Sequence, residues 1–122
     1  MKVIFKNEEA REQYCEKDSD TWHRYPEKVK DSLEQLDNFI KSAESLQNLR
    51  IYPPLHLEIM KGKIQKRKKP TGERSVRVTG TQYRVIFIPC DDNERELIGG
   101  DILAQARTIK IIKVTEVSKH YA

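Results

Sequence analysis

The feature that most constrains the fold of this 122-residue chain is one long amphipathic stripe. Its apolar residues recur at spacings of 4, 3, 4 and 3, the period of one helix face, at Val29, Leu33, Leu36, Ile40 and Ala43. Phe39 and Leu46 widen the stripe, Pro26 stands near its first turn, and the prolines at 53–54 end the helical region. The stripe is too short for an extended coiled coil, so it predicts a helix that packs on a sheet.

Short runs rich in β-branched and aromatic residues predict the strands of that sheet. Four such runs stand at residues 2–5, 74–79, 82–90 and 108–114. The second and third alternate and are joined by a short link, which predicts an antiparallel hairpin. The fourth is apolar on both faces, as expected of a central strand. Between the runs, residues 7–24 show a weak helical pattern, and 102–107 fit a short helix capped by Asp101.

The order of strand, two helices and three strands predicts an α+β fold, with residues 1–122 forming one domain. We expect the long helix to cover one face of a mostly antiparallel sheet and the other face to be open. Arg77 and Arg84 occupy alternating strands and need not lie in the core. A concave face with arginines on it suits a ligand that carries phosphate.

The net charge of +4 is concentrated in one segment. Residues 61–84 carry nine Lys or Arg against one acid (+8), whereas 1–60 carry 9 against 12 (−3) and 85–122 carry 5 against 6 (−1). A basic segment favours a polyanionic partner, since phosphates gain from nearby cations and from counterion release. A solvated, lysine-rich loop is the equally compatible reading of residues 63–74.

Cysteine and histidine spacing predicts neither a disulfide nor a metal site. Cys15 and Cys90 lie far apart without a ligand cluster around them, which predicts two buried thiols. The three histidines share no metal spacing, so we expect no metal and no cofactor. No apolar stretch approaches a membrane span, and residues 1–10 are charged where a signal peptide is apolar, which together predict a cytoplasmic protein without a membrane partner.

Three short motifs resemble a known family when taken in order. They are Leu-Glu-Ile-Met-Lys-Gly at 57–62, Ser-x-Arg-Val at 75–78 and Tyr-Arg-Val at 83–85, followed by a last strand that ends near His120. Over roughly residues 27–122, this combination resembles the RelE/ParE superfamily of bacterial toxins, particularly its HigB and YoeB branches. The resemblance implies a RelE-like fold and a type II toxin that cleaves messenger RNA on the ribosome and is neutralised by a cognate antitoxin, a small helix-turn-helix protein.

The resemblance also implies roles for individual residues. Glu58 matches the general base of YoeB-like members, Arg84 the phosphate-stabilising arginine, and His120 the general acid. The remaining positions are substrate-binding candidates or, for the last, a substitute base: Lys61, Arg77, Tyr83, Tyr121 and His56. Base, acid and cations are what metal-free RNA cleavage by the substrate's own 2′-hydroxyl requires.

Other interpretations remain open at the level of sequence. Glu58 also reads as a surface acid, His56 as a structural histidine, Arg77 as the partner of an acid on the first helices, and His120 as part of a frayed end. Relative to the family, residues 63–74 and 89–107 are insertions, and Lys119 replaces a tyrosine of HigB-like members. The alternative functions are a ParE-like inhibitor of DNA gyrase and a basic RNA-binding module without catalysis.

Overall fold

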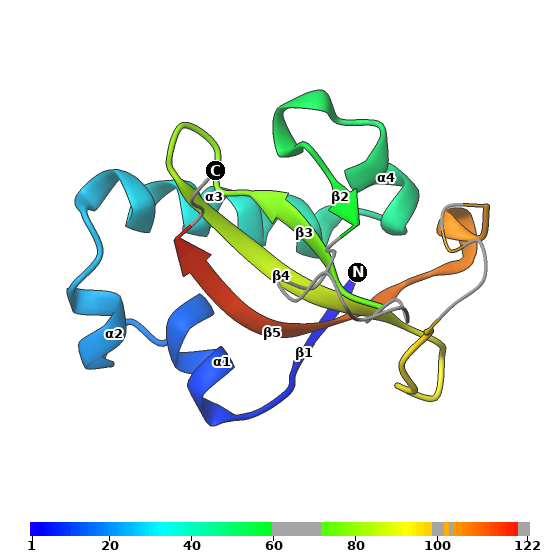
Figure 1. Ribbon diagram of the computed structural model, residues 1–122, viewed down its shortest axis with the longest axis horizontal. Helices are drawn as coiled ribbons and strands as arrows, with labels where there is room; N and C mark the ends of the chain where they lie inside the picture. Colours follow the sequence, from blue (N-terminus) through cyan, green and yellow to red (C-terminus); the bar gives the residue numbers. More distant parts are fainter. Residues whose placement is uncertain (60–71, 99–101, 103, 120–122) are drawn as a thin grey trace, which may run out of the picture.

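The computed structural model describes residues 1–59, 72–98, 102 and 104–119, and shows one five-stranded mixed sheet in the order β1-β5-β4-β3-β2 (Figure 1). The strands are β1 (Lys2–Phe5), β2 (Glu58–Ile59), β3 (Arg74–Arg77), β4 (Tyr83–Cys90) and β5 (Ile111–Lys119). β1 pairs parallel with β5, and the other pairings are antiparallel. The predicted α+β class, with an N-terminal strand, helices and a mostly antiparallel sheet, is confirmed.

β5 has a paired strand on each side, as its apolar sequence predicted, but it spans Ile111–Lys119 instead of residues 108–114. It pairs with β1 along one edge and with β4 along the other, and Ile111 and Ile112 are both buried although they point to opposite faces. The prediction of three strands after the helices missed β2, which pairs with β3 at the edge of the sheet. A strand of two residues is too short to show an alternating pattern, which explains the omission.

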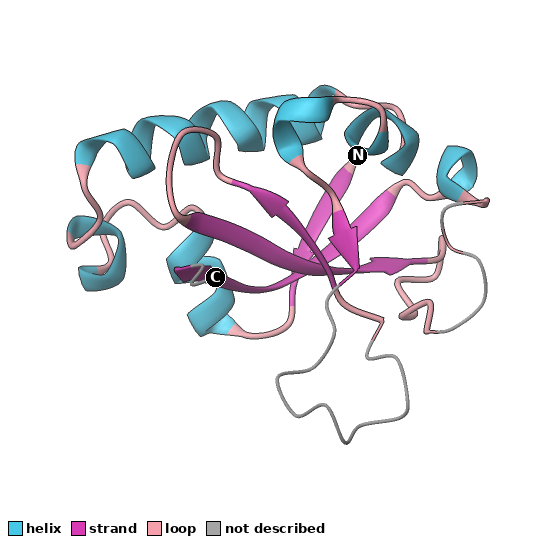
Figure 2. Cartoon of the chain, turned by 45° about the horizontal axis from the view of Figure 1, so that its top comes forward, coloured by secondary structure: helices cyan, strands magenta, loops and turns pink. Residues whose placement is uncertain are grey.

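The amphipathic stripe forms α3 (Glu27–Ser42), which lies along one face of the sheet (Figure 2). Its buried side chains join one core with residues of the sheet that face the helix, including Val76, Val85, Phe87, Ile112 and Val114. The helix ends earlier than predicted, because Ala43 is extended and Ser45 caps a separate helix, α4 (Leu46–Arg50). Ser45 and Asn48 form the reciprocal hydrogen bonds of a capping box, which fixes the start of α4.

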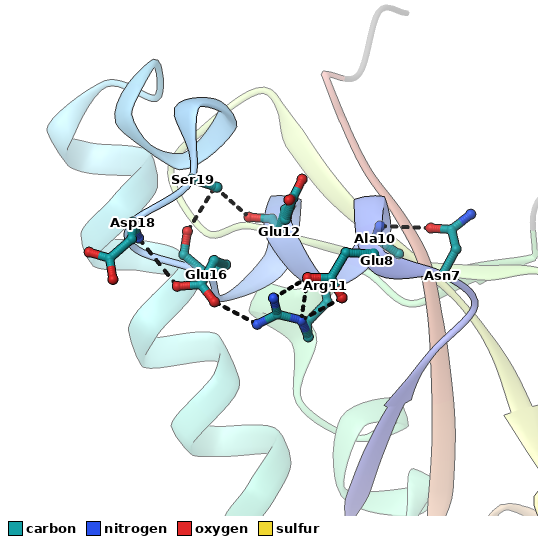
Figure 3. Close-up of polar contacts among 8 residues, drawn as sticks. All are labelled: Asn7, Glu8, Ala10, Arg11, Glu12, Glu16, Asp18 and Ser19. Carbon is teal, nitrogen blue, oxygen red and sulfur yellow. Dashed lines mark hydrogen bonds and ion pairs between the residues drawn. The ribbon is translucent and has the colours of Figure 1, made fainter.

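The predicted helical stretch 7–24 is two short helices, α1 (Glu8–Tyr14) and α2 (Asp20–His23). Each begins at a polar cap: Asn7 Oδ1 accepts from the Ala10 amide at 2.8 Å, and Ser19 Oγ accepts from the Trp22 amide at 3.1 Å. Arg11 donates to both Glu8 and Glu16, which ties α1 to the turn that follows it (Figure 3). Ser19 starts a new helix inside the stretch that was predicted as one helical pattern. This break explains why the apolar periodicity over residues 7–24 was weak.

α1 lies beside the C-terminal half of β5, beyond the point where β1 ends (Figure 1). Gln13 Oε1 accepts a hydrogen bond from the Val117 amide at 2.9 Å, so a side chain replaces the missing strand neighbour there. The backbone carbonyl of Gln13 in turn accepts from the Tyr25 hydroxyl at 2.8 Å. These two bonds hold the end of β5 against the first two helices.

Two further expectations need correction. The described residues of the predicted helix 102–107 form turns that lead into a 3-10 helix, η2 (Ala106–Thr108), and the proposed cap Asp101 lies outside the described residues. Both thiols are free, but only Cys90 is fully buried, since Cys15, between α1 and α2, is partly buried against the core. No helix among the described residues is long and apolar enough to cross a membrane.

Replacing Gln13 with Ala should loosen the end of β5, because the buried strand loses its acceptor at Val117. We expect a loss of about 0.5–1.5 kcal/mol in the free energy of unfolding, with faster hydrogen exchange at the Val117 amide. Gln35→Ala makes the same change at an exposed position of α3 and should affect neither quantity. Equal effects of the two variants in urea denaturation and exchange would show that the contact contributes nothing.

The Arg11 contacts predict a pH dependence. Hydrogen bonds from Arg11 lower the pKa of Glu8 and of Glu16. A carboxyl whose pKa is lowered by folding contributes stability above its unfolded pKa, about 4.3, that is lost as the pH falls through its folded pKa. Arg11→Gln should therefore lower Tm more at pH 7 than under acidic conditions, because the contribution of the two carboxylates is lost progressively as the pH falls through their lowered pKa values. Arg24→Gln, at an exposed arginine of the α2 end, is the control in the same thermal scans.

Candidate functional site

The strand register brings four polar residues to the sheet face opposite α3. Arg77 pairs with Arg84, and Glu58 pairs with Ser75. Paired residues share a face and neighbours along a strand alternate, so these four lie together, whereas Val76 and Val85 face the helix core. Glu58, Arg77 and Arg84, three of the residues singled out in the sequence, are therefore brought to one surface.

Arg84 is held in a fixed orientation within this surface. It is only 3% exposed. Its Nε donates to Ser75 Oγ at 2.8 Å, and its Nη2 donates to the His56 carbonyl at 2.5 Å and to the Ser75 carbonyl at 3.5 Å. All three acceptors come from β3 or from the segment before β2, so the guanidinium is turned toward β2. The expectation of an open face is wrong here, because Arg84, Ile86 and Ile88 are all buried.

Glu58 is the carboxylate next to this guanidinium. Its Oε2 lies 3.7 Å from Arg84 Nη2, and its side chain is 56% exposed. Burial lowers the pKa of Arg84, the carboxylate of Glu58 opposes that shift, and the neighbouring charge of Arg77 adds to it. Two arginines and one carboxylate leave this surface with a net positive charge.

Arg77 places a second positive charge directly opposite Arg84. Like charges directly opposite each other on paired strands repel, and Arg77 stands opposite Arg84. Among the described residues, Arg77 forms no ion pair, so the alternative that it pairs with an acid of the first helices has no support there. An anion bound between the two guanidinium groups would relieve the repulsion, which makes this surface a candidate anion site.

His56 contributes to the site through its backbone. It follows a 3-10 helix, η1 (Pro53–Leu55), in the left-handed conformation with φ 45°, and its carbonyl accepts from Arg84. The residue is exposed. This carbonyl contact gives His56 a structural part in the site, and its role as a substitute base stays a prediction.

Tyr83 is not brought to the same face as Arg84. Its ring packs edge-on against Tyr25 at a centroid distance of 5.5 Å, and Tyr25 packs on Trp22 at 5.7 Å. Adjacent residues of a strand point to opposite faces, so Tyr83 belongs to the helix side of the sheet. Stacking of Tyr83 on a base bound at Arg84 therefore has no geometric support.

Three predicted site residues, Lys61, His120 and Tyr121, lie outside the described residues. The described part of β5 runs to Lys119, which pairs with Tyr83, and Ser118 pairs with Arg84. β5 thus ends in register with the candidate site. Sequence reasoning gave no role to Ser75, although its place two residues before Arg77 in the Ser-x-Arg motif already put both on one face.

Comparisons with family models, with curated proteins and with solved structures returned no match for this chain. Within the described ranges, no three His, Cys, Asp or Glu side chains are grouped as metal ligands would be. The arrangement offers one exposed carboxylate, one fixed guanidinium and a second guanidinium opposite it. Such a set suits an anionic ligand that needs both charge stabilisation and a nearby base.

Removing the Ser75 hydroxyl should destabilise the protein, because it leaves Arg84 Nε buried without its acceptor. Ser75→Ala should lower the free energy of unfolding by about 1–3 kcal/mol. Ser118→Ala, on the neighbouring strand and also paired with Arg84, should change it by less than about 0.5 kcal/mol. Urea denaturation measures both, and an unchanged midpoint for Ser75→Ala would contradict the anchoring role.

Proposed function

We propose that this protein is a toxin-type endoribonuclease that cleaves messenger RNA on the ribosome without a metal, as a member of a type II toxin-antitoxin pair. The observation that carries the proposal is the shared sheet face of Glu58, Arg77 and Arg84, with Glu58 Oε2 at 3.7 Å from the fixed guanidinium. The motif order that resembles RelE/ParE toxins supports the same interpretation. Its partners are messenger RNA on the ribosome and a cognate antitoxin.

The proposed reaction uses the ribose 2′-hydroxyl as nucleophile. Glu58 takes the proton of this hydroxyl, whose oxygen attacks the adjacent phosphorus, and Arg84 stabilises the negative charge that accumulates on the phosphate oxygens. The bond to the 5′-oxygen breaks, and His120 gives that oxygen a proton. The products are a 2′,3′-cyclic phosphate and a free 5′-hydroxyl. Histidine suits the donor role because its unperturbed pKa of about 6.5 lies close to neutrality.

The exposure of Glu58 suits the role of general base. An exposed carboxylate beside a buried guanidinium remains accessible to substrate while the cation stays close to the reacting phosphate. Lys61 and Arg77 are assigned to flanking phosphates, and Tyr121 takes over the stacking role that Tyr83 cannot share with Arg84. The basic segment 61–84 adds long-range attraction for a polyanion.

Induction of the chain in bacteria tests the proposal. The unchanged protein should stop growth and create new transcript 5′ ends within codons, whereas Glu58→Gln and His120→Gln should each reduce cleavage by about 100-fold or more. Glu116→Gln, at an exposed glutamate of β5, should remain toxic. Circular dichroism is used to check that each variant folds. Growth arrest without new 5′ ends would instead favour the gyrase inhibitor, and RNA binding without arrest or cleavage the non-catalytic module.

A further inference from the structure

The contact between Glu58 and Arg84 is an ion pair without a hydrogen bond. At 3.7 Å, the separation of Oε2 and Nη2 exceeds hydrogen-bond length, and the Glu58 side chain is more than half exposed. The same Nη2 makes a short bond to the His56 carbonyl. Glu58 therefore offsets the charge of Arg84 while remaining loosely held.

The two partners of this pair differ in freedom. Arg84 is fixed by Ser75 and by the His56 carbonyl and is almost fully buried. Glu58 is an exposed side chain on a two-residue edge strand. An anion approaching Arg84 would therefore meet a fixed guanidinium and a carboxylate that is free to move aside. A phosphate and Glu58 compete for one cation, and both are negative.

We propose that Glu58 is a displaceable counterion that closes the Arg84 site to weak anions and is pushed aside by an RNA phosphate. This inference deepens the proposed function and rests on it for the identity of the ligand. Arg77 provides the second cation that a strand with successive phosphates engages and a lone small anion does not. Once displaced, the carboxylate still lies next to the bound phosphate, where the 2′-hydroxyl proton is removed.

The proposal gives Glu58 opposite effects on binding and on cleavage. Neutralising the side chain removes both the competitor for Arg84 and the repulsion of phosphate, so binding becomes tighter. It also removes the base, so cleavage becomes slower. A residue that only held RNA, or only held the fold, would not produce this pair of opposite changes.

The test measures the binding of a fluorescent single-stranded oligonucleotide with 2′-deoxyribose throughout, which lacks the attacking hydroxyl. Fluorescence anisotropy titrations at several salt concentrations compare the unchanged protein with Glu58→Gln. We expect Kd to fall about two- to fivefold, the range of an exposed ion pair. The slope of log K against log salt should steepen by about 0.7, because one more cation is free to neutralise a phosphate.

Glu116→Gln is the matched control. Glu116 pairs with Ile86, in the same row across the same sheet face as Ser75 and Glu58, and is exposed. Its replacement changes the net charge by the same amount, but the Arg84 guanidinium is turned toward β2, away from β5. We expect Glu116→Gln to change Kd less than half as much on a logarithmic scale and to leave the salt slope unchanged.

The outcomes separate this inference from the proposed function. Equal affinities of Glu58→Gln and Glu116→Gln, or no binding by any variant, would overturn the counterion role. Tighter binding by Glu58→Gln alone supports it, whether or not the unchanged protein cleaves RNA on ribosomes. If the unchanged protein creates no new transcript 5′ ends in the induction experiment, that result counts against the nuclease proposal only.

Discussion

The pairing of β4 with β5 determines both the core and the candidate site. A register shift between Ile86 and Phe87 leaves Thr115 as an extra residue of β5, and its Oγ1 donates to the Ile86 carbonyl at 3.2 Å. Val114 and Val117 are three residues apart, a spacing that would place them on opposite faces of a regular strand. The shift lets both join the core beneath α3.

The same shift fixes the opposite face. After it, Ser118 stands opposite Arg84 and Lys119 opposite Tyr83, so the end of β5 reaches the candidate site in register. The Gln13 side chain then holds this half of β5 where β1 no longer accompanies it. The position of the strand end at Lys119 is thus a consequence of core packing and of one side-chain hydrogen bond.

Periodicity predicted the elements that bury a long regular face. The stripe from Val29 to Ile40 and the apolar start of β5 were predicted correctly because their burial is what creates the pattern. The rest of β5, residues 115–119, was missed because fewer of its residues are buried. The ends of the helices were harder to predict from the sequence. Ser19 and Ser45 form local capping bonds that end one helix and start another without changing the apolar spacing. β2 was missed because two residues are too few to show the alternating pattern of a strand.

The spatial grouping of the candidate residues was predicted in part, and the differences have physical causes, while the roles of these residues stay predictions. The resemblance selected Glu58, Arg77 and Arg84, which the register brings together, but it also grouped Tyr83 with Arg84. Alternation along β4 already assigned these neighbours to opposite faces. The burial of Arg84 could not be read from the sequence, because an arginine in a basic segment is usually exposed and its acceptors include a backbone carbonyl.

Burial of Arg84 has a consequence for how charge is distributed on this face. A buried cation without compensation is strongly unfavourable, and its three hydrogen bonds to neutral acceptors lessen that penalty without cancelling the charge. Full compensation would require a buried carboxylate, which would close the surface to ligands. An exposed glutamate at 3.7 Å is an intermediate solution, because it partly offsets the buried charge and, in the proposed counterion role, can give way to a stronger anion. Glu58 thus has two effects on Arg84. It partly neutralises the buried guanidinium, and because it is itself exposed it does not cover that guanidinium permanently.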